Sequence, residues 1–170
     1  AAFEAPGTDL LLQEQRWMGL FDKETLALSH RNDLGNFGLF FSGLYADEID
    51  RYSFDSIGIP EGSFAPYQVA IGLSYAHKIT SVLSAGVMLK FLHEEIDVYS
   101  GSGYAFDFSL AHKAIIDGLW FGASITNMGA DFTLYENAYK LPTAIRFGFR
   151  YDPQIPLFAN RVSIAGDIIS

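Results

Sequence analysis

Between residues 69 and 76 the chain alternates large apolar side chains with very small ones. The sequence of this stretch is VAIGLSYA. A period of two is that of a β-strand, whose successive side chains point to opposite faces of a sheet. The strand therefore has one bulky apolar face and one face of glycine, alanine and serine. Few environments accept such a pair of faces, and this restricts the fold more than any other feature of the sequence.

The same alternation recurs along most of the chain. NFGLFFSGLYA (36–46), SAGVMLKFLHEE (84–95), GYAFDFSLAHK (103–113) and TAIRFGFRYD (143–152) all follow it. Helical spacing is not sustained anywhere, so the pattern predicts an all-β protein built as an antiparallel meander. The expected strands lie at about 8–17, 23–31, 36–46, 67–78, 82–96, 102–113, 118–128, 142–152 and 160–169.

The connections between these strands are expected to alternate in length. Short ones include NDLG (32–35), ITS (79–81) and the Asp117-Gly118 pair, which is a signal for a two-residue hairpin turn. The longer ones are 47–66, about 97–101 and 129–141, and they are rich in acids. Long loops at one end and tight turns at the other are typical of an up-and-down barrel of the outer-membrane kind.

The small face has two alternative interpretations, one in a soluble protein and one in a membrane. In a soluble sandwich or barrel, the bulky face is the core and the other face carries polar side chains. In a transmembrane β-barrel, the bulky face meets lipid and aromatic residues lie near the interfaces. Strands of ten or more residues suit a tilted crossing of the bilayer. We expect an outward bulky face and an inward small face, with Val69, Ile71, Leu73, Leu89, Phe106, Phe108, Phe121, Phe147 and Phe149 outward, and Gly72, Gly86, Asp107, Gly122, Gly148 and Arg150 inward.

Charge and motifs restrict the function. The formal charge is −9, which disfavours nucleic acid as a partner, and the absence of cysteine excludes disulfides and thiolate metal sites. No P-loop, Gly-x-Ser-x-Gly or His-Glu-x-x-His motif is present. The four histidines fall on the bulky face near strand ends, and no serine is expected within reach of one. We therefore expect that the protein is not an enzyme and that it binds no metal and no cofactor.

Charged residues on the small face form the first candidate site. In a barrel they point into the lumen, where opposite charges pair across strands, hold a plug or a loop, or line a path for a substrate. In a soluble protein they would be surface charges. The candidate lumen-facing residues are Lys90, Glu94, Asp107, Lys113, Arg146, Arg150 and Asp167.

The longest loop, 47–66, is the second candidate site. Connections of this length are usually functional or disordered. It mixes acids with bulky apolar residues that would be costly to leave in water, so we expect an ordered loop that either covers the barrel mouth or packs on a protein partner. The candidate partner-binding residues are Ile49, Tyr52, Phe54 and Phe64.

A family resemblance covers the chain from about residue 8 onward. The ordered series APYQVAIGLSYAHKITSVLSAGVMLKFLHEEIDVYSGSGYAFDFSLAHK, GLWFGASITNMG and LPTAIRFGFRY resembles the PorV/PorQ family of outer-membrane barrels, which is related in architecture to the FadL-like transporters. The resemblance implies the bacterial outer membrane of a Gram-negative cell. It also implies a non-enzymatic role in type IX protein secretion and cargo attachment, with membrane lipid or lipopolysaccharide and other envelope or secretion proteins as partners. A FadL-like transporter of hydrophobic compounds and a structural barrel subunit of an envelope complex remain open.

Strand number bears on domain organisation. Single-chain bacterial outer-membrane barrels have even strand numbers, whereas nine strands are expected here. Family members also carry an N-terminal plug, of which only EAPGT (4–8) could be a remnant. We therefore expect residues 1–170 to form a single domain that is a segment of a larger barrel, without the N-terminal plug and the C-terminal strands. The strands at about 8–17 and 160–169 should not pair with each other.

Overall fold

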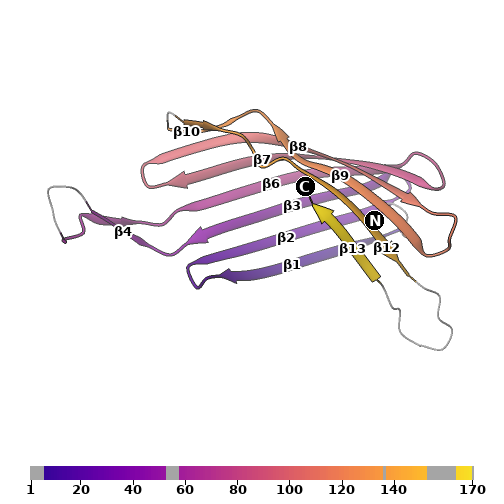
Figure 1. Ribbon diagram of the computed structural model, residues 1–170, viewed down its shortest axis with the longest axis horizontal. Coiled ribbons are helices and arrows are strands. Elements are labelled where there is room, and N and C mark those ends of the chain that lie inside the picture. Colours follow the sequence, from indigo (N-terminus) through magenta and orange to yellow (C-terminus); the bar gives the residue numbers. More distant parts are fainter. Residues whose placement is uncertain (1–5, 53–57, 136, 153–163, 170) are drawn as a thin grey trace.

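The computed structural model describes residues 6–52, 58–135, 137–152 and 164–169, and these residues form an all-β fold (Figure 1). A nine-stranded antiparallel sheet has the order β1-β2-β3-β6-β7-β8-β9-β12-β13, which is a meander in sequence order. Its strands are β1 (Gly7–Trp17), β2 (Phe21–Asn32), β3 (Gly35–Ala46), β6 (Tyr67–Lys78), β7 (Leu83–Ile96), β8 (Tyr99–Lys113), β9 (Leu119–Gly129), β12 (Ala144–Tyr151) and β13 (Ile164–Ile169). The prediction of nine meandering strands is confirmed; positions 160–163 of the last expected strand lie outside the described residues.

Two short ribbons lie within segments expected to be loops. β4 (Ile49–Arg51) pairs with β5 (Gly62–Phe64), and β10 (Phe132–Leu134) pairs with β11 (Asn137–Tyr139). Three-residue strands are too short to show a period of two, which explains why the sequence pattern did not reveal them. No helix occurs in the described part of the chain, and therefore no helical membrane span is found there.

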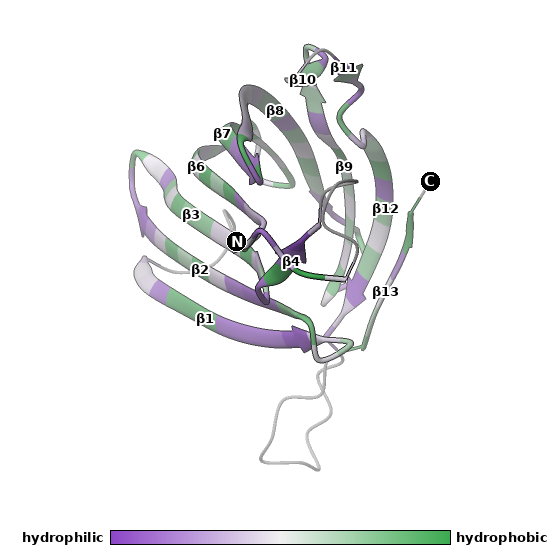
Figure 2. Ribbon diagram, turned by 90° about the vertical axis from the view of Figure 1, so that its left-hand side faces the viewer, coloured by the Kyte–Doolittle hydropathy of each residue, from purple (hydrophilic) through white to green (hydrophobic). Residues whose placement is uncertain are grey.

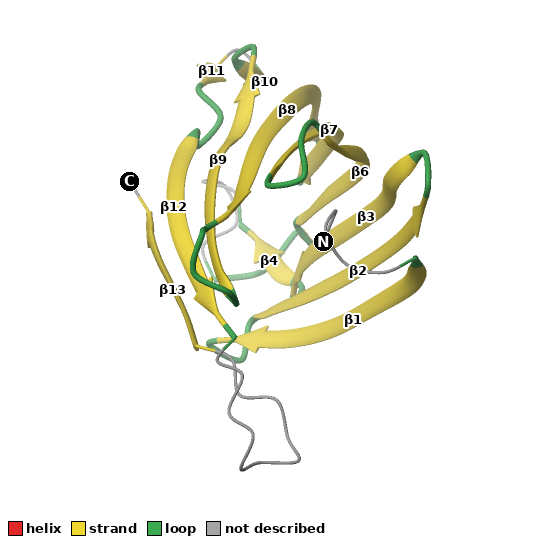
Figure 3. Ribbon diagram, turned by 90° about the vertical axis from the view of Figure 1, so that its right-hand side faces the viewer, coloured by secondary structure: helices red, strands yellow, loops and turns green. Residues whose placement is uncertain are grey.

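The sheet curves into an open half-barrel (Figure 3). β1 and β13 are its two edges, and within the described residues no ladder joins them. The expectation that the first and last strands do not pair with each other is confirmed. Each edge strand therefore has one row of backbone groups without a ladder partner among the described residues.

The connections alternate less strictly than expected. What we call the loop end carries the turns 18–20 and 97–98 and the connections 47–66 and 130–143; the turn end carries 33–34, 79–82, 114–118 and 152–163. The prediction of a long loop at 97–101 is wrong, because Asp97 adopts φ +57° and closes a tight turn. Asp117-Gly118 does not form a two-residue hairpin either; β8 and β9 are joined by residues 114–118. β12 ends and β13 begins at the end expected to hold only tight turns, and they are separated there by twelve residues, of which only Asp152 is among those described.

The ladder assigns every strand residue to one of two faces. Leu28, Leu39, Leu73, Leu89 and Phe106 are successive cross-strand partners on the bulky face. On the other face Gly72, Lys90 and Ala105 are successive partners. All the residues predicted to share the bulky face or the small face do so. Figure 2 shows the resulting stripes of hydrophobic and hydrophilic residues along the strands.

Exposure shows which face is convex. Side chains on the convex side of a curved sheet diverge and stay accessible, while those on the concave side converge. Phe108 and Phe147 on the bulky face are 48% and 62% exposed, whereas Ala105 and Lys90 on the small face are 0% and 8% exposed. The bulky face is therefore convex, and no other part of the described chain covers it.

One irregularity changes the alternation on β9. Between Phe106 and Phe108 the β8–β9 register shifts, so that Thr126 and Asn127 together lie opposite Asp107. Asn127 has φ +59°, a conformation that asparagine tolerates better than most residues. This β-bulge brings Asn127 to the small face, although strict alternation would place it on the bulky face.

Candidate functional site on the concave face

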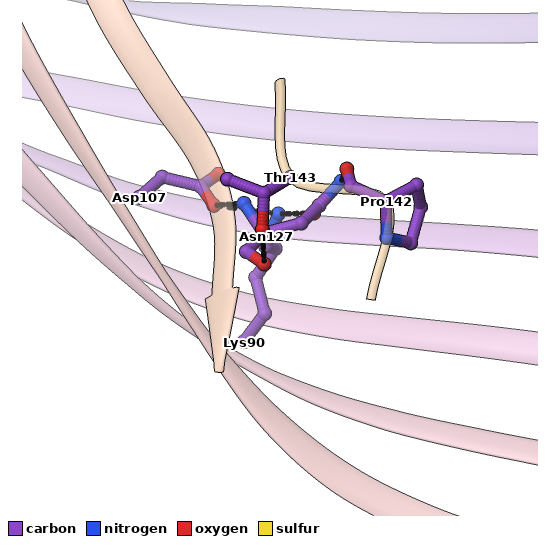
Figure 4. A network of polar contacts seen from close by, with 5 residues as sticks. All are labelled: Lys90, Asp107, Asn127, Pro142 and Thr143. Atoms are coloured by element: carbon purple, nitrogen blue, oxygen red, sulfur yellow. Dashed lines mark hydrogen bonds and ion pairs between the residues drawn. The ribbon is translucent and has the colours of Figure 1, made fainter. Parts of the chain in front are cut away.

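A buried ion pair lies at the centre of the concave face, beside the bulge. The Lys90 ammonium is 2.7 Å from Asp107 Oδ1 and donates a hydrogen bond of 2.5 Å to Asn127 Oδ1 (Figure 4). The side chains of Lys90 and Asp107 are 10% and 18% exposed. Lys90 comes from β7, Asp107 from β8 and Asn127 from β9, so the cluster links three neighbouring strands.

Asn127 also connects this cluster to the connection that enters β12. Its backbone N–H donates to Asp107 Oδ1 at 2.8 Å, and its Nδ2 donates to the Pro142 carbonyl at 3.0 Å. The Thr143 hydroxyl donates to the Asn127 carbonyl at 3.1 Å. Every polar group of Asn127 therefore has a partner, and Asn127 connects the ion pair to residues 142–143 (Figure 4).

The β10–β11 ribbon lies against the concave face of β8. Phe132, 2% exposed, covers Gly101 and Gly103, because an added Cβ on these residues would lie 2.9 and 3.1 Å from its ring. Tyr139 packs its ring 5.2 Å from that of Phe132 and donates a hydrogen bond of 2.5 Å to Glu94. Burial, and then this bond to a carboxylate, raise the pKa of Tyr139 above the usual range for tyrosine. We call the described residues between β9 and β12 the strap.

The other predicted lumen residues are also on the small face, but they are not part of this cluster. The Lys113 ammonium lies 5.9 Å from the Trp120 ring centre, and Arg150 forms an ion pair of 2.9 Å with Asp152. Arg146 pairs with Ser124 and Ile169 in the ladder, and Asp167 pairs with Gly148. The predicted set is thus divided among the Lys90–Asp107 cluster, the Glu94–Tyr139 contact and a distal group near β12.

The chemistry of the Lys90 cluster is that of a fixed structural contact. The Lys90 ammonium and the Asp107 carboxylate face each other, and both groups also form a hydrogen bond with Asn127. Such a closed pair is not poised to transfer a proton to a ligand. Among the described residues, no group of three or more histidines and acids could hold a metal ion.

The loop residues predicted to bind a partner are only partly available to one. Ile49 and Tyr52 are exposed, whereas Phe64 is half-buried and is the ladder partner of Ile49; Phe54 lies outside the described residues. The described part of the loop is ordered as the β4–β5 ribbon, which projects beyond the strand ends of the sheet (Figure 1). Arg51 of the ribbon contacts the Asp97 carboxylate at the β7–β8 turn.

A serine and a histidine do meet on the bulky face, contrary to the sequence-based expectation. Ser102 and His93 are cross-strand partners, and Ser102 Oγ lies 2.9 Å from His93 Nδ1. His93 Nε2 is 3.4 Å from the Tyr67 hydroxyl, which donates to Glu95 at 2.9 Å. Separation by nine residues in sequence hid a pair that the β7–β8 turn brings together.

Three residues of the site were not predicted from the sequence. Asn127 was missed because a bulge cannot be seen in an alternating pattern, although an asparagine shortly before Gly129 is a weak signal for one. Phe132 and Tyr139 were missed because they lie in a segment expected to be a loop. The glycines at 101 and 103, facing the same way, were the available signal that another segment packs closely there.

Comparison with known proteins adds no relative to this picture. No family model, no curated protein and no solved structure matches the chain.

Proposed function

We propose that this chain forms part of the wall of a transmembrane β-barrel in a bacterial outer membrane. The observation that carries the proposal is the convex face, on which large apolar side chains from eight neighbouring strands, β1 to β12, are exposed. Leu10, Leu39, Leu73, Phe106, Phe121 and Phe147 are between 48% and 62% exposed. A soluble protein rarely exposes an apolar patch larger than a few hundred Å².

The convex face is more stable in lipid than in water. Moving one large apolar side chain out of water contributes about 1.5–3 kcal/mol, and the face has many such side chains. Lipid supplies that environment without requiring a second protein layer. The concave face, with its glycine, alanine, serine and paired ions, has the composition of a barrel lumen.

The unpaired edges of β1 and β13 extend the proposal. A sheet edge in contact with lipid leaves backbone groups without hydrogen bonds, each at a cost of several kcal/mol. We propose that other strands pair with β1 and β13 in the membrane and close the barrel.

A narrower proposal concerns the pathway. We propose a non-enzymatic role of the PorV/PorQ type in type IX protein secretion, with envelope or secretion proteins as partners. It is supported by the family resemblance of the ordered strand signatures and by the ordered β4–β5 ribbon, which presents exposed Ile49 and Tyr52 beyond the sheet. In this role, the Lys90–Asp107 cluster would hold the strap in place.

A FadL-like transport function is the second candidate. It is favoured by a hollow of about 250 Å³ whose lining includes small concave-face residues such as Ala76, Gly86 and Ser109. In a transporter this space would be part of a path for an apolar substrate, and the wall rather than the loops would determine function.

Deletion of residues 49–63 separates the two candidates. The full-length barrel is expressed with and without the deletion, and its insertion is checked by detergent extraction from outer membranes. A secretion component loses co-purifying envelope or cargo proteins while permeability stays constant. Unchanged partner recovery with altered uptake of hydrophobic compounds would instead support the transporter.

A further inference from the structure

A second set of exposed apolar residues lies at the loop end, at the tip of the β1–β2 hairpin and along β4, from Ile49 at its start to Tyr52 directly after its last residue. Its members, which we call the tip patch, are Trp17, Met18, Leu20, Ile49 and Tyr52. Met18 is 88% exposed, and the others are between 46% and 59% exposed. None of these residues has a role in the strap or in the Lys90 cluster.

The tip patch is held in a fixed shape before any partner binds. The Leu20 carbonyl accepts a hydrogen bond of 3.0 Å from the Asp47 N–H, which joins the β1–β2 turn to the start of the ribbon. Arg16 reaches Asp47 at 3.7 Å, and Arg51 contacts Asp97. A surface that is already ordered loses little conformational entropy on binding.

The ladder separates the tip patch from the apolar band of the convex face. Moving along β1 and β2 toward the loop end, the convex positions change from Leu12 and Leu26 to the facing pair Glu14 and Glu24. The next cross-strand pair is Arg16 and Asp22, whose side chains are 3.6 Å apart. We call these two rows the polar collar. On β3 and β6 the same rows hold Gly43, Tyr45, Tyr67 and Val69, and they become polar again on β7 and β8, with His93, Glu95, Ser100 and Ser102. Because charged side chains avoid the hydrocarbon layer, the collar holds the tip patch outside it.

The charges around the tip patch are mainly negative. The β1–β2 hairpin tip, the ribbon and the β7–β8 turn carry the acids Asp22, Asp47, Glu48, Asp50, Glu61 and Asp97 and the bases Arg16, Lys23 and Arg51. Arg16 forms ion pairs with Asp22 and Asp47, and Arg51 with Asp97. Aromatic and aliphatic anchors inside a charged rim are typical of protein-binding surfaces, and an excess of acids in the rim favours a partner with positive charge.

We propose that the tip patch is a docking surface for a protein segment that combines apolar side chains with lysine or arginine. This inference rests on the proposed membrane orientation, so its test must show both where the barrel wall lies and where the tip patch lies.

The first arm of the test measures lipid contact. Trp120→Phe leaves Trp17 as the only tryptophan of residues 1–170, and the full-length barrel is reconstituted in vesicles of dibrominated phosphatidylcholine, which quenches tryptophan in the hydrocarbon layer. A matched protein carries Trp17→Phe, Trp120→Phe and Phe108→Trp. The inference predicts quenching of the indole introduced at position 108 of the matched protein and no quenching of Trp17. Quenching of both identifies the tip patch as a lipid anchor and overturns the inference; quenching of neither overturns the proposed membrane wall.

The second arm measures binding, with Trp17 fluorescence as the readout. Four synthetic peptides of equal length are compared: apolar with lysines, apolar with glutamates, apolar and uncharged, and lysine-rich without apolar residues. The apolar lysine peptide should bind about tenfold more tightly than the glutamate peptide, and the difference should shrink in high salt. Equal binding of all four peptides overturns the inference.

Paired variants locate the binding to the tip patch. Met18→Asn and Leu20→Ser remove apolar surface, and asparagine suits the φ of +52° at position 18. Leu34→Ser is the matched control, because Leu34 is 71% exposed in a turn at the opposite end. Binding of the apolar lysine peptide should fall about tenfold in the double variant and stay unchanged in the control. Unchanged binding in the double variant overturns the inference.

Discussion

Replacement of Asp107 by alanine tests the energetics of the concave-face cluster. In the wild type, the Asp107 carboxylate is 2.7 Å from the Lys90 ammonium and accepts the Asn127 N–H at 2.8 Å. The alanine variant leaves the ammonium of a lysine side chain that is 10% exposed facing only Asn127 Oδ1, and it leaves the Asn127 N–H without its acceptor. Removing one partner of a buried pair costs about 3–5 kcal/mol, and because Asp107 is partly exposed we expect a loss of about 3 kcal/mol.

A double-mutant cycle isolates the pair from its surroundings. Asp107→Asn keeps an oxygen for the Asn127 N–H but removes the charge, and Lys90→Met keeps the aliphatic stem that packs beside Gly72. Each single variant should lose about 2–4 kcal/mol, while the double variant should lose less than either because no buried charge remains unpaired. Unfolding of the full-length barrel in urea, followed in phospholipid vesicles, measures each free energy. Losses that add within about 0.5 kcal/mol would refute the reasoning.

Three other predictions concern the wall and the strap. Phe108→Arg should destabilise the inserted barrel by about 2–4 kcal/mol, while Ser124→Arg on the concave face should cost much less; equal costs in urea unfolding would contradict the assigned faces. Gly101→Ala should displace the strap, because the added Cβ would crowd the Thr133 carbonyl oxygen. Gly122→Ala is the control, since its Cβ would meet no atom closer than 3.9 Å. We expect faster proteolysis at 130–143 in the Gly101 variant alone. Because its pKa is raised, Tyr139 stays protonated, and its hydrogen bond to Glu94 should persist as the pH rises through the ordinary tyrosine range and be lost only above that range. Absorbance titration of the wild type against Tyr139→Phe measures this pKa. Ionisation of Tyr139 within the ordinary tyrosine range would contradict the prediction.

The strands could be predicted from the sequence because a period of two extends over long segments. β6, for example, was placed at 67–78 and is observed as Tyr67–Lys78. The faces of the other strand residues followed from the same pattern, because every ladder in the described sheet keeps its register except at the bulge, which moves Asn127 to the small face. Turn lengths were less predictable. Asp117-Gly118 is a hairpin signal, yet the turn is closed by the Leu119 N–H bond to the Ile116 carbonyl within a longer loop.

The candidate site was only partly predictable. Lys90 and Asp107 could be placed on one face, but their pairing depends on strand neighbours that only the register shows. Asn127 joins them because of a local change in backbone conformation, which leaves no periodic signature. The strap packs through three-residue strands, whose contacts come from tertiary structure and not from local sequence preference.

Accessibility along β8 tests most directly the claim that the convex face meets lipid. Nitroxide labels are placed one at a time at residues 104–111 of the full-length protein in liposomes, and collisions with oxygen and with a water-soluble nickel complex are measured by electron paramagnetic resonance. The account predicts a period of two, with high oxygen and low nickel accessibility at Tyr104, Phe106, Phe108 and Leu110 and the reverse trend at Asp107, Ser109 and Ala111. Uniform accessibility, or nickel contact at Phe106 and Phe108, would contradict it.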